Sequence, residues 1–275
     1  MIDILLSTYN GEKYLKELLQ SIINQTFIDW KLFIRDDFST DKTLEIIDFF
    51  CEKYDNKIFL LKDNFENIGV SKSFGVLLEK STADFIMFCD QDDVWLPTKI
   101  EKTFSVMQKA IFENPKKPIL VCTDLKIVDE NLQVISNSMW QCSKILPELL
   151  KSSFEYLSAC NFVTGCTMLL NKEAKKNALP FDETTKIHDL WIALKVLIHN
   201  GLLIPVYEQT ILYRQHSDNK FGAPIYEKNY FFYKIKTFNS TLKSNKETYT
   251  MAKSIKKINI FTYLTYKIKY FFKRK

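Results

Sequence analysis

Short apolar runs alternate with amphipathic stretches along the first 90 residues of the chain. The runs at residues 2–6, 30–34, 58–61 and 85–89 have the length of buried strands. Between them, apolar positions recur at the i, i+3, i+4 spacing of helices that cover a core. Strands that alternate with helices predict a parallel sheet covered on both faces. We therefore expect an α/β fold.

Beyond this region the pattern continues less regularly. We expect helices after Pro97 and at residues 172–179 and 187–198, and strands at residues 119–122, 162–170, 202–206 and 211–213. Residues 127–135 are expected to form a bend, and residues 137–158 fit no single element.

Polar residues follow three of the predicted parallel strands. The segment from Ser7 to Asn10 follows the first strand, Asp36 and Asp37 follow the second, and residues 90–93 follow the fourth. Ligands of open α/β sheets bind outside the carboxyl ends of the strands, so we expect these clusters on one rim. Packed carboxylates repel one another unless a cation lies among them, and Mg²⁺ often shares its oxygen ligands with phosphates. The pattern favours a metal site for a phosphorylated ligand over a polar turn with capping aspartates.

The composition is that of a globular protein, with 46% hydrophobic and 26% charged residues among 275. No basic leader precedes the first apolar run, and no run of about 18 apolar residues predicts a membrane-spanning helix. The six cysteines are scattered without a CxxC spacing, which argues against zinc and against a disulfide framework. We expect reduced thiols in a cytoplasmic protein.

The charge is concentrated in the C-terminal tail. Residues 226–275 contain 13 Lys and Arg against two acidic residues, whereas the whole chain carries only +5. As a helix, residues 260–275 place apolar side chains on one arc, with tyrosines and lysines around it. This pattern is typical of a helix that lies on an anionic membrane; packing on the body or an oligomer contact is the alternative. Basic and aromatic residues also suit nucleic acids, but no such motif appears, and we expect no nucleic-acid partner.

Six ordered motifs make the chain resemble the inverting family 2 nucleotide-sugar glycosyltransferases of the GT-A fold. The motifs are STYNG at 7–11, DDFSTDKT at 36–43, NIG at 67–69, DQDDVW at 90–95, TGC at 164–166 and HDLW at 188–191. YRQHSDN at 213–219 further resembles the rhamnosyltransferase-like members. Phe38 departs from the family, which often has glycine there. The resemblance implies a GT-A domain at 1–220, with a mixed, mostly parallel sheet, and a basic helical extension at 221–275.

The resemblance also implies how a nucleotide-sugar binds. Ser7 and Tyr9 would line the nucleoside pocket, with Tyr9 stacked on the base, and Asp36 or Asp37 would accept a hydrogen bond from the base N3–H. Uracil and thymine both carry this group, so UDP-sugars and dTDP-sugars are both candidate donors. Rim packing is the alternative for Tyr9, and helix capping is the alternative for the aspartates.

A divalent cation, Mn²⁺ or Mg²⁺, is implied at the acidic motif. Asp93 is assigned to the cation and Asp92 to the ribose hydroxyls or a metal-bound water, while Asp90 belongs to the site or is structural. The cation would offset the charge that develops on the departing diphosphate. Arg214 and His216 would approach the diphosphate from the last loop, with a structural role as the alternative.

Asp189 is the candidate general base, because a carboxylate can take the proton of an attacking sugar hydroxyl. Single displacement would then invert the anomeric configuration. A residue placed at the helix start to match the dipole is the alternative. For His188, a supporting role and a surface imidazole both stay open, and Trp191 is an acceptor platform or a core residue.

The expected function is glycosyl transfer to a saccharide or lipid-linked saccharide in surface polysaccharide synthesis, with dTDP-rhamnose among the candidate donors. The enzyme would be peripheral on the inner face of the cell membrane. A sugar-phosphate nucleotidyltransferase is one alternative, but it is expected to have a glycine-rich loop with a basic residue after the first strand, which residues 7–11 lack. A non-catalytic membrane-associated binding module is the other.

Overall fold

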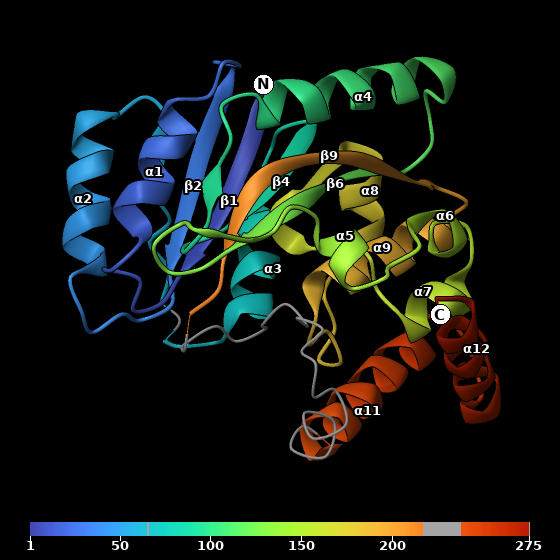
Figure 1. The fold of residues 1–275 in the computed structure, drawn as a ribbon. Coiled ribbons are helices and arrows are strands. Elements are labelled where there is room, and N and C mark those ends of the chain that lie inside the picture. Colours follow the sequence, from blue (N-terminus) through green and yellow to red (C-terminus); the bar gives the residue numbers. More distant parts are fainter. Residues whose placement is uncertain (65, 217–237, 275) are drawn as a thin grey trace.

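The computed structural model of the chain describes residues 1–64, 66–216 and 238–274 (Figure 1). Its centre is one mixed sheet with the strand order β3-β2-β1-β4-β8-β6-β9-β5, and β7 pairs with β6. The strands are β1 (Ile2–Thr8), β2 (Trp30–Asp36), β3 (Ile58–Leu60), β4 (Phe85–Asp90), β5 (Val94–Trp95), β6 (Ile119–Val128), β7 (Val134–Ser136), β8 (Met168–Asn171) and β9 (Leu202–Arg214).

Pairing within the sheet changes from parallel to mixed along this order. β1 pairs in parallel with β2 and β4, and β2 pairs in parallel with β3. β8 runs antiparallel to both β4 and β6, whereas β9 runs parallel to β6. The predicted α/β class and the mostly parallel first half of the sheet are thus confirmed.

Helices cover both faces of the sheet (Figure 1). Along β1, Ile4 and Leu6 pack with α1 (Leu15–Ile23), α2 (Thr43–Lys53) and α4 (Lys99–Glu113). The intervening Leu5 packs in a second core with α3 (Val70–Lys80), α8 (Lys172–Ala178) and α9 (His188–Ile198). Side chains alternate between the two faces of a strand, so a strand buried on both sides reads as a continuous apolar run.

Several elements differ from the prediction, among them the strand expected at 119–122, which extends to Val128 as β6. The two strands expected at 202–206 and 211–213 form the single strand β9, because its pairing with β6 continues through two register shifts. The strand expected at 162–170 begins only at Met168, after a 3₁₀ turn at Gly165–Thr167. Residues 137–158, which fitted no single element, contain the short helices α5 (Met139–Cys142), α6 (Pro147–Leu150) and most of α7 (Phe154–Ala159).

Two C-terminal helices, α11 (Phe238–Ile255) and α12 (Ile260–Lys273), pack against α7, and α11 also contacts α9. Tyr263 and Tyr270 of α12 are buried, and the Tyr270 hydroxyl accepts a hydrogen bond from the Leu146 N–H. The predicted domain boundary at residues 220–221 lies outside the described residues. Of the helices described, none has the length and apolarity required to span a membrane.

Candidate active site

The parallel register of β1, β2 and β4 brings three polar segments to one edge of the sheet. Thr8 is level with Asp36, and Ser7 is level with both Arg35 and Asp90. Ser7 is half-buried at this edge. The carboxyl ends of these strands therefore form the shared rim that the sequence predicted.

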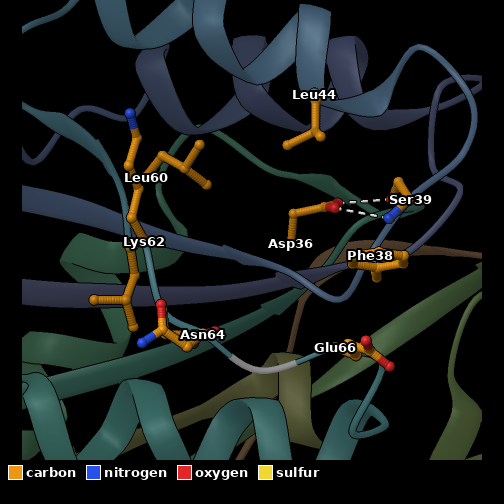
Figure 2. Close-up of a pocket in the computed structure, with 10 residues that line it drawn as sticks. Asp36, Phe38, Ser39, Leu44, Leu60, Lys62, Asn64 and Glu66 are labelled. Atoms are coloured by element: carbon orange, nitrogen blue, oxygen red, sulfur yellow. Dashed lines mark hydrogen bonds between the residues drawn. The ribbon is translucent and has the colours of Figure 1, made fainter.

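Asp36 is the carboxylate of the second segment that faces a cavity. One of its oxygens accepts hydrogen bonds from the hydroxyls of Thr8 (2.7 Å) and Ser39 (2.6 Å), and the other accepts the Ser39 N–H at 2.8 Å. A carboxylate has about four acceptor positions, so it retains capacity for a ligand donor. The cavity measures about 550 Å³ (Figure 2).

Asp37 has a different role from its neighbour, because it is 3% exposed. It forms an ion pair with the buried Arg35 at 2.6 Å and accepts the backbone N–H groups of Ile68 and Gly69. These contacts engage both of its oxygens and hold the loop before α3. The sequence left both aspartates open for contact with a base; of the two, Asp36 lines the cavity, whereas Asp37 supports the loop.

Tyr9 is 49% exposed at the rim, as expected of a residue that meets a ligand. The sequence did not single out Gln91, which links the loop of Tyr9 to the acidic motif. The Tyr9 N–H donates to Gln91 Oε1 at 2.8 Å, and Gln91 Nε2 donates to the Tyr9 carbonyl at 2.9 Å. A Cβ on Gly11 would lie 2.5 Å from Gln91 Oε1, so a larger residue there would displace the Gln91 side chain.

The acidic motif divides into a buried part and a rim part. Asp93 is fully buried; its Oδ1 accepts the Arg214 N–H at 3.2 Å, and its Oδ2 has no hydrogen-bond partner among the described residues. Ligand atoms of Asp90, Asp93 and Cys166 lie within 4.8 Å of one another. Burial raises the pKa of Asp90 to about 7 and the pKa of Asp93 well above its usual value, and burial also raises the pKa of Cys166.

Asp92 lies at the rim, where His216 reaches it. His216 Nε2 and Asp92 Oδ2 are 2.9 Å apart, and both side chains keep some exposure, 12% and 17%. The imidazole also packs against the Tyr14 ring, with centroids 5.0 Å apart. This contact brings a carboxylate and an imidazole together at the same edge as Asp36.

Two groups of side chains could hold the cation that the resemblance implies: Asp92 with His216 at the rim, and Asp90 with Asp93 and Cys166 in the interior. The rim pair of Asp92 and His216 offers oxygen and nitrogen donors that suit Mn²⁺ and stay reachable for a diphosphate. The buried set includes the Cys166 thiol, which is a poor ligand for the hard Mg²⁺. The residues present therefore fit a divalent cation, and they fit it best at Asp92.

Arg214 is buried, with 2% exposure, and its guanidinium is engaged within the protein. Nε donates to the Asp92 carbonyl (2.8 Å), Nη1 donates to the Glu130 carbonyl (2.7 Å), and Nη2 pairs with Glu17. The guanidinium also lies over the Tyr14 ring at 4.4 Å. The expectation that Arg214 approaches the diphosphate stays a prediction, because the guanidinium would have to leave these acceptors to do so. Its observed role is to hold the acidic motif.

Asp189 lies in the first turn of α9, with its carboxylate directed to the residues before β8. It accepts hydrogen bonds from the N–H of Gly165 (3.1 Å), from the side-chain amide of Asn161 (3.2 Å) and from the N–H of Leu190. Burial nevertheless raises its pKa to about 7. Repulsion from Asp189 contributes to the raised pKa of Asp90, so the two carboxylates share one electrostatic environment.

Two residues left open by the sequence are internal. The His188 ring packs on Phe74 at 4.4 Å, and a Cβ on Gly165 would lie 2.7 Å from its Nε2. Burial lowers the pKa of His188 to about 3, so it is a neutral packing residue and not a surface imidazole. Trp191 is 4% exposed and donates its indole N–H to the Ala178 carbonyl, which makes it a core residue.

Curated relatives of this chain are named as sugar transferases. The dTDP-rhamnosyl transferase RfbG of Shigella flexneri is 29% identical over 230 residues, which cover 80% of this chain and 74% of RfbG. The UDP-Glc:alpha-D-GlcNAc-diphosphoundecaprenol beta-1,3-glucosyltransferase WfgD of Escherichia coli is 24% identical over 203 residues, which cover 74% of this chain and 72% of WfgD.

Solved structures share the fold. S. aureus TarS 1–349 in complex with UDP has a TM-score of 0.57 at 23% identity, over 78% of this chain and 60% of that one. The mannosyltransferase PcManGT from Pyrobaculum calidifontis, in complex with GDP-Man and Mn²⁺, has a TM-score of 0.59 at 15% identity, over 96% of this chain and 72% of that one. These likenesses confirm the GT-A fold implied by the motifs.

The family itself is established by the sequence. The model of glycosyl transferase family 2 matches residues 3–172 and so covers more than half of the chain, including the rim segments after β1, β2 and β4. The resemblance found in the six motifs is thereby confirmed. This chain belongs to glycosyl transferase family 2.

Proposed function

We propose that this protein transfers a sugar from a nucleotide-diphosphate donor, a UDP- or dTDP-sugar, to an acceptor hydroxyl with inversion at the anomeric carbon. The observation that carries the proposal is the position of Asp189. Its carboxylate lies in the same electrostatic environment as Asp90 of the acidic motif, with a pKa of about 7. A base works best when its pKa is near the working pH, so this carboxylate suits proton removal from a sugar hydroxyl.

The hydrogen bonds to Asp189 support its role as the base. Three donors, two of them backbone N–H groups, fix the carboxylate in one orientation. They also stabilise its ionised form against the burial that raises its pKa. In the proposed step Asp189 takes the proton while the hydroxyl oxygen bonds to the anomeric carbon and the bond to the diphosphate breaks. A single displacement of this kind inverts the configuration.

The nucleotide is proposed to bind at the rim formed by the loops after β1, β2 and β3, with its base in the cavity that Asp36 lines. Asp36 accepts the base N–H, Tyr9 offers an exposed ring for stacking, and Ser7 lines the nucleoside side of the edge. Asp92 and His216 are proposed to hold Mn²⁺ or Mg²⁺. When bound, the cation would neutralise charge on the departing diphosphate. Arg214 and Asp93 support this site indirectly: the Arg214 side chain donates to the Asp92 carbonyl and the Asp93 carboxylate accepts the Arg214 N–H, so the two residues join the acidic motif to the end of β9.

The acceptor is proposed to be a saccharide or a lipid-linked saccharide of a surface polysaccharide. Support comes from the relatives, because WfgD is named for a diphosphoundecaprenol-linked acceptor and RfbG for dTDP-rhamnosyl transfer. RfbG also supports dTDP-rhamnose as one donor to test.

A thermal-shift screen tests the donor. With Mn²⁺ present, one class of nucleoside diphosphate or nucleotide-sugar is expected to raise the melting temperature, because a ligand that binds only the native state stabilises it by mass action. At 100 times its dissociation constant the ligand adds about 2.7 kcal/mol. A sugar nucleotide that stabilises the protein is then incubated with candidate acceptors. Free nucleoside diphosphate and a lengthened saccharide are the expected products; a nucleotidyltransferase would instead release pyrophosphate from a nucleoside triphosphate and a sugar phosphate.

We further propose that α12 holds the protein on an anionic membrane. The buried tyrosines of α12 face the body, whereas apolar side chains on its other face are solvent-exposed: Phe261 (79%), Leu264 (45%), Ile268 (57%) and Phe272 (65%). Exposed Lys257, Lys269 and Lys273 accompany this stripe. An apolar stripe with neighbouring lysines suits a surface of anionic lipids, and such contact would bring the site close to a lipid-linked acceptor.

Vesicle flotation tests this membrane contact. Wild type is expected to float with vesicles that contain phosphatidylglycerol, and the double variant Phe261→Ser, Ile268→Ser is expected to lose at least about tenfold in partitioning, because each buried side chain contributes about 1.5–3 kcal/mol. Phe112→Ser is the matched control, since Phe112 is 89% exposed on α4. If wild type stays in the aqueous fraction, the proposed membrane contact is wrong. If wild type forms a dimer without lipid and the double variant does not, the apolar stripe is an oligomer contact.

A further inference from the structure

Phe38 adopts a backbone conformation that bulky residues avoid. Its φ is 73°, in the left-handed region, where the side chain of an L-residue crowds the backbone. Its ring is also 62% exposed, so core packing does not compensate for the conformation. Glycine would fit this backbone without strain, and asparagine would fit it with little. A large aromatic residue here has no evident structural benefit, and strain of this kind is often found at ligand sites.

Hydrogen bonds on both sides hold the loop in this conformation. Before Phe38, the Asp37 N–H donates to the Thr8 carbonyl at 2.8 Å. After it, the Ser39 N–H donates to Asp36 at 2.8 Å, and the Asn10 N–H donates to Ser39 Oγ at 2.9 Å. The loop therefore keeps its shape through its neighbours and not through the Phe38 side chain. Replacing that side chain should leave the loop in place.

The Phe38 ring lines the cavity that Asp36 faces. Figure 2 shows Asp36, Phe38 and Ser39 on one side of this space and Leu60, Lys62 and Asn64 across it. The cavity thus combines an aromatic face, apolar walls from Leu44 and Leu60, and the Asp36 carboxylate, while Lys62, Asp63 and Glu66 also line it. A flat heteroaromatic ring that carries an N–H group matches this combination. Uracil, thymine and guanine have such a ring N–H, whereas neutral cytosine and adenine do not.

We propose that Phe38 stacks on the nucleobase of the donor and supplies part of its binding affinity, while Asp36 selects bases that carry a ring N–H. The inference rests on the proposed function, because it requires a nucleotide at this edge of the sheet. Base–aromatic stacking depends little on which base is bound. Phe38 therefore strengthens the binding of all accepted nucleotides alike, and it has no contact with the diphosphate or the sugar.

Calorimetry of Phe38→Asn, Phe38→Gly and Phe38→Tyr, with UDP, TDP and pyrophosphate in the presence of Mn²⁺, tests this role. The Asn and Gly variants are expected to bind UDP and TDP about tenfold more weakly, because the Phe38 ring no longer stacks on the base and only the Tyr9 ring is left. Their affinity for pyrophosphate should equal that of wild type, because pyrophosphate has no base. Phe38→Tyr should retain nucleotide affinity. Melting temperatures of the Asn and Gly variants should match or exceed wild type, because the strain at φ 73° is relieved.

The outcomes separate this inference from the proposed function. Wild type that binds none of the nucleotides would contradict the proposed function itself. Wild type that binds UDP or TDP while Phe38→Asn binds them equally well would overturn only the role of Phe38. A Phe38→Asn variant that melts earlier and loses pyrophosphate as well would assign Phe38 a purely structural role, which also overturns the inference.

Discussion

Replacing Asp189 with asparagine is expected to slow sugar transfer by about 10²–10⁴-fold, the usual contribution of a positioned general base. The amide cannot take the proton of the acceptor hydroxyl, although it keeps the shape of the carboxylate. Binding of the donor nucleotide should stay close to wild type, because the residues proposed to bind it lie on β1, β2 and the acidic motif. The measurement is the rate of acceptor glycosylation at saturating donor, alongside calorimetry with UDP or TDP.

Asp189 also determines how transfer activity is expected to depend on pH. Only the ionised carboxylate can act as a base, so kcat/KM should rise with pH and level off above the pKa of about 7. Between pH 6 and pH 8 the increase should be about tenfold for a single group. Asp90 also has a pKa of about 7 and interacts with Asp189, so the midpoint belongs to the pair. The residual activity of Asp189→Asn should lose most of this dependence.

A surface aspartate supplies the control. Asp84 lies at the opposite end of β4, where its side chain is 66% exposed and pairs with Lys172. Asp84→Asn is expected to keep wild-type activity and the wild-type pH profile. If Asp189→Asn transfers sugar at the wild-type rate, Asp189 is not the base, and the inverting mechanism needs another carboxylate.

Asp92→Asn is expected to weaken Mn²⁺ binding in the presence of UDP or TDP by at least about tenfold and to reduce transfer about 10²-fold. The loss follows from removing a charged ligand where a carboxylate and an imidazole meet at the rim. His216→Ala should weaken Mn²⁺ binding by about tenfold or more, since it removes the nitrogen ligand. The electron paramagnetic resonance signal of free Mn²⁺ reports binding independently of activity.

Asp93→Asn provides the sharpest comparison, because the sequence favoured Asp93 for the cation. Asp93 is fully buried beside the Cys166 thiol and away from the rim pair of Asp92 and His216, so an amide should retain most Mn²⁺ affinity. Chelation with EDTA should abolish the transfer activity of wild type, and added Mn²⁺ should restore it. If Asp92→Asn binds Mn²⁺ as wild type does and Asp93→Asn loses Mn²⁺ binding, then Asp93 is the cation ligand.

Much of the fold follows from local patterns. The apolar runs at β1, β2 and β4 can be read directly, because a strand buried on both faces needs apolar residues at nearly every position. The amphipathic spacing of α1 likewise marks a helix that covers a sheet. β9 was divided in the prediction because Glu208 and Gln209 interrupt its apolar residues, while pairing with β6 continues past them.

The candidate site was predictable to the level of its segments but not its individual side chains. Sequence order and the rule for parallel sheets were sufficient to place Tyr9, Asp36 and the acidic motif on one edge. Adjacent aspartates share the same local signal, yet Asp36 faces a cavity while Asp37 pairs with Arg35. Neighbouring side chains of an extended chain point in opposite directions. The two aspartates therefore differ in burial, although they look alike in sequence.

The acidic motif illustrates the division most clearly. The sequence by itself determined that three carboxylates follow a buried strand, and so determined where charge collects. Only the tertiary structure decided that Asp93 is enclosed, that Asp92 meets His216, and that Arg214 is occupied in holding the motif. These contacts join residues more than 120 positions apart. Local patterns record which groups can ionise, whereas solvent access and distant partners decide how each group behaves.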